Sequence, residues 1–140
     1  AGDRVIVIGG NQAGLVLADF LAEKGKDVAL LNRKRHFGEE MSSNDRFYVR
    51  ERLKRDNVRL HKQVSVKAFL PDGAVFRSGG EEVRLEGFDT VVISEKMTPI
   101  RKAAELFKDM DIPVHIIGDA KSPRILMHAL SEAEEIGRTV

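Results

Sequence analysis

The stretch "VIVIGGNQAGLVLADFLAEKGKDVALLN", residues 5–32, decides the fold of this 140-residue chain. Residues 5–8 are a continuous apolar run of β-branched side chains, which is typical of a strand buried on both faces. Residues 12–24 place apolar side chains at helical spacing, and Gly25 follows as a stop signal. Residues 28–31 predict a second buried strand. A strand, a glycine-rich turn, a helix and another strand, in this order, begin a Rossmann-like unit.

The rest of the chain extends this pattern into an α/β fold. Residues 42–45 supply capping side chains for a helix that ends near Arg55, and residues 58–60 predict a third strand. Residues 89–94 and 114–119 return to the buried strand type. We therefore expect a doubly wound parallel sheet in the order 3-2-1-4-5, with right-handed crossovers.

Two regions depart from the alternation of buried strands and helices. Residues 63–70, 74–77 and 82–85 are short strand candidates separated by "PDG" and "SGG", so they predict a small antiparallel β flap. Further on, Thr98-Pro99 and Ser122-Pro123 predict two helix starts, each with proline at the first helical position. The sequence has no repeat or linker, so residues 1–140 are expected to form a single domain.

Composition narrows the function classes. The net charge is +1, so nothing overall demands a nucleic-acid or membrane partner. The chain has no Cys, which excludes disulfides, thiol catalysis and cysteine-held metal clusters within it. No apolar run could span a membrane and no secretory signal is visible, so we expect a cytoplasmic location. The four histidines are too scattered to predict a metal site, and the basic run of residues 46–59 predicts a salt-bridged helix face.

The glycine turn is the candidate nucleotide site. In a dinucleotide-binding turn the first glycine permits the tight bend, the second admits the pyrophosphate, and the third lets helix and strand pack closely. Here Gly9 and Gly14 hold the first and third positions, with Gly10 between, but Asn11 replaces the second. The free backbone amides that follow the bend, together with the helix dipole, would still favour an anion. Those amides belong to Asn11, Gln12 and Ala13.

The end of the second strand predicts how a ribose would be bound. An acidic residue there would take the adenine ribose hydroxyls and select NAD, but this chain has Asn32. Arg33 and Lys34 follow, and their charges would suit a 2′-phosphate, so NADP and NAD both stay open. Glu39 and Glu40 are expected to be surface charges.

Four segments together resemble a known family. They are the opening stretch, "MSSNDRFYVRERLKRDNVRLH", "FDTVVIS" and "VHIIGDAKSPRILMHALSEAEEIGR". They resemble the C-terminal nucleotide-binding region of old-yellow-enzyme-like NADH:flavin oxidoreductases, the group that includes 2,4-dienoyl-CoA reductase and trimethylamine dehydrogenase. The resemblance implies that residues 4–112 are an NAD(P)-type domain and that residues 113–140 return to an FAD-type fold. It also implies that Gly118 and Asp119 meet the flavin nucleotide and that Ser94 lies beside the cleft.

The resemblance further implies that this chain is a fragment of a larger flavoprotein oxidoreductase. A barrel domain with FMN, often with an iron–sulfur cluster, is expected only in the missing parts, and the chain alone should not turn over substrate. It would hold the ADP part of NAD(P) or FAD and carry no catalytic residue. Because Asn11 departs from the glycine pattern, two alternatives remain open. One is a degenerate Rossmann domain that packs against other domains, and the other is a nucleotide-sensing domain without redox chemistry.

Overall fold

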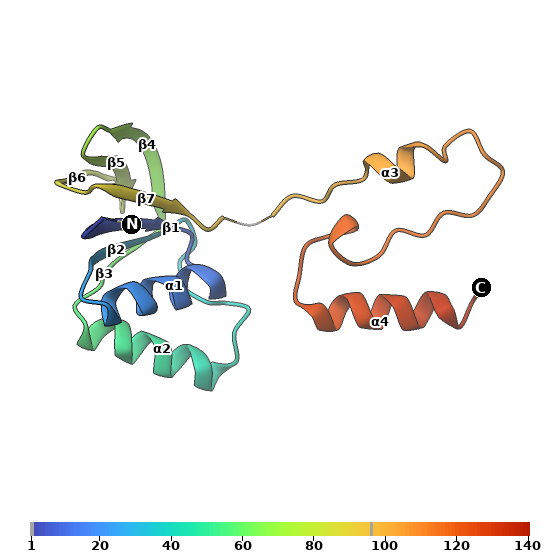
Figure 1. Ribbon diagram of the computed structural model, residues 1–140, viewed down its shortest axis with the longest axis horizontal. Coiled ribbons are helices and arrows are strands. Elements are labelled where there is room, and N and C mark those ends of the chain that lie inside the picture. Colours follow the sequence, from blue (N-terminus) through green and yellow to red (C-terminus); the bar gives the residue numbers. More distant parts are fainter. Residues whose placement is uncertain (1, 96) are drawn as a thin grey trace. The chain divides into compact units, whose positions relative to one another are not determined.

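The computed structural model describes residues 2–95 and 97–140. The chain forms two compact units, of which the first ends at Glu95 and the second runs to Val140. Figure 1 shows that the sheets and the two longer N-terminal helices belong to the first unit, while the second contains helical and extended segments.

A parallel sheet forms the centre of the first unit. Its four strands lie in the order β3-β2-β1-β7, and every neighbouring pair is parallel. The strands are β1 (Arg4–Ile8), β2 (Asp27–Asn32), β3 (Arg59–Lys62) and β7 (Thr90–Ile93). This arrangement confirms the Rossmann-like α/β class and the 3-2-1-4 part of the predicted order.

The two faces of the parallel sheet are covered by different layers. Helices α1 (Gln12–Glu23) and α2 (Ser43–Arg55) lie on one side, and a second sheet lies on the other (Figure 1). Because successive side chains of a strand point to opposite faces, β1 contributes to both interfaces. Val5 and Val7 pack in one core cluster with Leu15 of α1, whereas Ile6 packs in the other with Phe76. All five of these side chains are fully buried, so β1 is the centre of the core.

The second sheet is the predicted antiparallel flap. Its strands lie in the order β4-β5-β6, with an irregularity in β4 between Val66 and Ala68. They are β4 (Val64–Leu70), β5 (Gly73–Ser78) and β6 (Glu81–Glu86). The turns fall at "PDG" and "SGG" as predicted, because glycine and proline allow the chain to reverse there.

The second unit differs from the sequence prediction at residues 114–117, where a strand was expected. Residues 114–117 form no strand in the part of the chain that the structure describes, although their apolar run predicted one. A strand is completed by hydrogen bonds to a neighbouring strand, and apolar character alone does not supply them. The fifth strand of the predicted order is therefore not formed.

The helices of the second unit also begin later than predicted. Helix α3 covers only Lys102–Glu105, after Pro99, and helix α4 covers Leu126–Gly137, after Pro123. A tight turn precedes α4, in which the amides of Lys121 and Ser122 both donate to the Gly118 carbonyl. The Ser122 backbone is thus engaged in that turn and does not begin the helix. No residue of α3 or α4 is buried, so burial does not extend either helix.

No helix within residues 2–95 and 97–140 combines the length and the apolar character that crossing a lipid bilayer requires.

Candidate nucleotide site

The turn after β1 is built around Gly9. Its φ of 119° is one that side-chain-bearing residues rarely adopt, and an added Cβ would lie 2.0 Å from the Ser94 carbonyl oxygen. The Gly9 amide donates to the Leu31 carbonyl at 2.8 Å, and the Ser94 amide donates to the Ile8 carbonyl at 2.6 Å. The turn therefore rests on the carboxyl ends of three neighbouring parallel strands, where ligands of open α/β sheets bind.

Gly14 brings helix α1 directly against this turn. A Cβ at Gly14 would lie 1.8 Å from the Gly9 carbonyl oxygen, which is backbone and cannot rotate away. Only glycine permits this approach, so Gly9 and Gly14 each have the steric reason that the sequence pattern indicated.

The carboxamide of Asn11 lies within the turn and is hydrogen-bonded at both ends. Its Oδ1 accepts from the Gly14 amide at 2.8 Å, so Asn11 is the N-cap of α1. Its Nδ2 donates to the Ser94 carbonyl at 2.8 Å, and the Ser94 hydroxyl donates back to Oδ1 at 3.2 Å. Asn11 therefore joins the start of α1 to the segment after β7, a role that the sequence did not predict.

The amides at the start of α1 are not all free, contrary to the expectation for Asn11, Gln12 and Ala13. The Gln12 amide donates to Oε1 of Glu40, a residue that was expected to be only a surface charge. The amides of Asn11 and Ala13 have no hydrogen-bond partner among residues 2–95 and 97–140. The helix start thus already holds one internal carboxylate and keeps two of the three amides available.

The loop after β2 closes over the turn. The Gly38 amide donates to the Gly10 carbonyl at 2.7 Å, and Phe37 is only 8% exposed. A Cβ at Gly10 would lie 2.4 Å from Cγ of Asn32 and 2.7 Å from Cδ1 of Phe37. Gly10 is therefore needed for contact between the turn and this loop.

Asn32 holds the same loop in place. It is 4% exposed; its Nδ2 donates to the His36 carbonyl at 2.7 Å, and its Oδ1 accepts from the Lys34 amide at 3.3 Å. Both ends of a buried amide side chain are thus satisfied within the loop. This structural role explains why an uncharged residue suits the position.

Arg33 and Lys34 form ion pairs at the surface. Arg33 Nη2 lies 3.8 Å from Glu95, and Lys34 Nζ lies 2.6 Å from Glu39. The hydrogen bond that Lys34 Nζ donates to the Glu39 carboxylate raises the pKa of Lys34 and lowers the pKa of Glu39. Exposed pairs of this kind contribute little stability, so either cation can exchange its partner for a phosphate at small cost.

A cavity of about 520 Å³ opens beside these strand ends. It lies between the parallel sheet and β4, and its wall is mostly apolar with charged groups at Arg33, Lys67 and Glu95. The lining residues are Ile8, Leu31, Arg33, Val64, Ser65, Val66, Lys67, Ala68, Phe69, Ile93 and Glu95.

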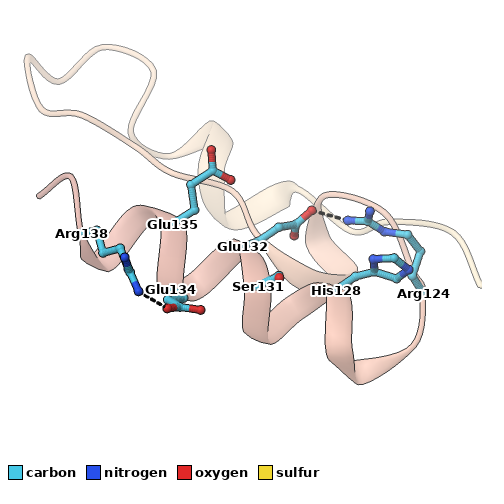
Figure 2. A pocket seen from close by; sticks show the side chains of 7 residues that line it. All are labelled: Arg124, His128, Ser131, Glu132, Glu134, Glu135 and Arg138. Atoms are coloured by element: carbon cyan, nitrogen blue, oxygen red, sulfur yellow. Dashed lines mark hydrogen bonds and ion pairs between the residues drawn. The ribbon is translucent and has the colours of Figure 1, made fainter.

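Gly118 and Asp119 belong to the second unit and have different surroundings. The Gly118 amide donates to Glu132 of α4 at 2.8 Å, and Glu132 also pairs with Lys121. Figure 2 shows the further ion pair between Glu132 and Arg124. The Gly118 hydrogen bond and these two cations lower the pKa of Glu132 to about 2. Glu132 therefore holds the loop that contains Gly118 and Asp119, which was predicted to contact the flavin nucleotide, against α4. Asp119 itself is exposed.

A cavity of about 460 Å³ lies along α4 and is lined by polar and charged residues, whose side chains are drawn in Figure 2. Its lining residues are Arg124, His128, Ser131, Glu132, Glu134, Glu135 and Arg138. The Glu134–Arg138 pair along the helix is a surface contact of adjacent turns.

Residues 1–119 match the family model described as pyridine nucleotide-disulphide oxidoreductase. The chain belongs to this family. The match includes the Gly9–Gly14 turn, the parallel sheet and the antiparallel flap.

Individual relatives agree with the family. An NADH oxidase of Thermoanaerobacter brockii is 26% identical over 138 residues, which are 96% of this chain and 21% of that protein. A cinnamate reductase of Clostridium sporogenes is 24% identical over 149 residues, covering 99% of this chain and 21% of that protein. The structure of a 2-naphthoyl-CoA reductase in complex with 2-naphthoyl-CoA matches with a TM-score of 0.81 and 27% identity, covering 99% of this chain and 21% of that one.

The chain thus spans about a fifth of the length of these relatives (21% in each case). The chain is a Rossmann-type region of the pyridine nucleotide-disulphide oxidoreductase family.

Proposed function

We propose that this chain holds the ADP part of a dinucleotide within a flavin-dependent NAD(P)H oxidoreductase. The observation that carries the proposal is the position of the Gly9–Gly14 turn. It places the start of α1 at the carboxyl ends of parallel strands, the usual place for a pyrophosphate. The redox centre lies in another part of the parent protein, so this region positions a cofactor and does not react.

The residues around the turn fit such a ligand. The Ala13 amide is available to donate to the diphosphate, and the Gln12 amide becomes available when Glu40 leaves it. Arg33 and Lys34, both exposed in the loop after β2, would form ion pairs with a 2′-phosphate of NADP. When bound, the nucleotide supplies hydride chemistry to the flavin, while this chain contributes orientation and charge.

We further propose a place for the chain in its parent. Residues 4–112 would be the NAD(P)-type domain, and residues 113–140 would return to an FAD-type fold, as in the old-yellow-enzyme-like group. In this arrangement Gly118 and Asp119 meet the arm of the flavin nucleotide, and Ser94 lies beside the cleft. A barrel domain carrying FMN, with or without an iron–sulfur cluster, would be the principal partner.

A thermal-shift experiment on the full chain tests ADP binding. Any ligand that binds only the folded state raises the melting temperature, and at a hundred times its Kd the gain is about 2.7 kcal/mol. We expect ADP and NADP to raise it and adenosine, which lacks phosphate, to raise it less. Lys34→Ala should reduce the response to NADP but leave the response to NAD, since only NADP carries the 2′-phosphate. No response to ADP, NAD, NADP or FAD at millimolar concentration would overturn the proposal.

A structural role is the second candidate, and Asn11 favours it. Its carboxamide already bonds Gly14 and Ser94, and Glu40 already bonds Gln12, so the turn is stable without a ligand. The chain would then be a Rossmann domain kept for packing against the rest of the flavoprotein. The absence of any nucleotide response, with an intact fold by circular dichroism, supports this candidate.

A further inference from the structure

Glu40 occupies the place where a Rossmann turn receives an anion. It lies between β2 and α2, and its carboxylate accepts a hydrogen bond from the amide of Gln12, the first residue of α1. The start of a helix attracts negative charge through its free amides and its dipole. The Glu40 carboxylate therefore engages one of the amides that a diphosphate would use.

The loop directs Glu40, and not its neighbour, to the turn. The Gly38 amide bonds the Gly10 carbonyl at 2.7 Å, and the Met41 amide bonds the Gly38 carbonyl at 3.0 Å, so both sides of Glu40 are held close to the turn. Glu39 instead pairs with Lys34 at 2.6 Å. The two adjacent glutamates therefore have different roles.

Asn11 and Glu40 differ in how readily a ligand could displace their side chains from the turn. Asn11 is fixed by hydrogen bonds to Gly14 and to Ser94 and is part of the turn itself. Glu40 is exposed, and the Gln12 amide is its one hydrogen-bond partner among the residues that the structure describes. A ligand can displace the Glu40 side chain by rotation without unfolding the turn.

We infer that Glu40 is an internal anion that competes with the diphosphate of a dinucleotide and thereby sets the affinity of the turn. The inference rests on the proposed function, because competition requires that a diphosphate binds there. Binding exchanges one hydrogen bond for another: the Gln12 amide releases the Glu40 carboxylate and donates to a phosphate oxygen. The nearby negative charge of Glu40 continues to oppose the ligand after it has been displaced.

Calorimetric titration of the full chain with ADP tests this competition. Glu40→Gln keeps an oxygen acceptor and removes the charge, while Glu40→Ala removes both. A matched control is Glu82→Gln, which makes the same charge change on β6, in the sheet that covers the opposite face from α1. We expect both Glu40 variants to bind ADP roughly tenfold more tightly, which corresponds to about 1.4 kcal/mol. Glu82→Gln should leave the affinity for ADP unchanged, and the Glu40 variants should leave the affinity for adenosine unchanged.

The outcomes separate this inference from the proposed function. If ADP binds the wild type and the Glu40 variants with equal affinity, Glu40 does not compete and the proposed function stands. If no variant binds ADP, the proposed function fails and the competition fails with it. Amide hydrogen exchange without ligand supplies a second measurement: the Gln12 amide should exchange faster in Glu40→Ala than in the wild type, and equal rates would overturn the contact.

Discussion

Replacing Gly14 by alanine should destabilise the first unit, although alanine is the better helix former. The added Cβ would lie 1.8 Å from the Gly9 carbonyl oxygen, so α1 or the turn must move by more than an ångström. Neither moves freely, because Leu15 and Ala18 of the same helix are fully buried against the sheet. Overpacking of this kind costs typically 1–3 kcal/mol, and a clash with backbone lies at the upper end, about 3 kcal/mol.

The gain in helix propensity offsets part of that cost. Alanine is favoured over glycine in a helix by roughly 1 kcal/mol, so the net loss for Gly14→Ala is roughly 2 kcal/mol. For a unit of this size, each kcal/mol lowers the melting temperature by about 4–8 °C, which gives a decrease of about 8–16 °C.

Thermal unfolding followed by far-ultraviolet circular dichroism measures this effect without a tryptophan, which the chain lacks. The control is Gly137→Ala at the end of α4, where an added Cβ meets nothing within 4 Å. The control should be neutral or slightly stabilising. If Gly14→Ala changes the melting temperature as little as Gly137→Ala does, α1 and the turn do not make the close contact described above.

Three further changes test other contacts. Asn11→Gly restores the glycine of the common pattern but removes the hydrogen bond to Ser94. It should therefore lower the free energy of unfolding of the first unit by roughly 1–2 kcal/mol, as measured by urea unfolding. An unchanged urea midpoint would contradict the role of the carboxamide. Burial, aided by nearby Arg59, lowers the pKa of His61 below 6.5, so the unfolded state binds more protons and stability should fall as the pH drops through 6.5. His61→Phe should flatten that part of the pH profile, and an identical profile would refute the burial of this imidazole. The pKa of Glu132 is lowered from 4.5 to about 2, so its contact with Gly118 should contribute fully to stability above pH 4.5. That contribution should be lost as the pH falls through about 2. A Glu132 titration midpoint near 4.5, measured by nuclear magnetic resonance, would disprove the contact.

The architecture of the first unit could be predicted because its signals are local. Residues 5–8 and 28–31 are apolar runs without polar interruption, and the turn between β1 and α1 needs glycine for steric reasons that any Rossmann unit shares. Ser42 was expected among the capping residues of the second helix, and its hydroxyl accepts from the Asp45 amide at 3.2 Å. Strand pairing then follows from the handedness of the crossovers.

The second unit was predicted less well because local rules lacked support from packing. Pro99 and Pro123 suit the first turn of a helix, yet α3 and α4 begin at Lys102 and Leu126. Neither helix buries a residue, so no burial within residues 2–95 and 97–140 compensates for ordering an additional turn. In the same described part of the chain, the apolar run of residues 114–117 has no neighbouring strand.

The contacts that define the candidate site could not be read from the sequence. Asn11 stands where the common pattern has glycine, and its bonds to Ser94 join positions far apart in the chain. Glu40 was one of two adjacent glutamates, and only the fold of the loop shows that it, and not Glu39, reaches Gln12. The positions of these side chains in the folded chain determine such roles, and the spacing of residues in the sequence does not reveal those positions.

The most direct test of ADP binding at the turn is a titration of the ¹⁵N-labelled full chain with ADP, followed by nuclear magnetic resonance. If the turn receives the diphosphate, the amide signals of Gln12 and Ala13 shift with ligand concentration along one saturating curve, while that of Gly79 in the flap turn stays in place. Signals of Gln12 and Ala13 that do not move, with shifts elsewhere or none at all, would contradict the account.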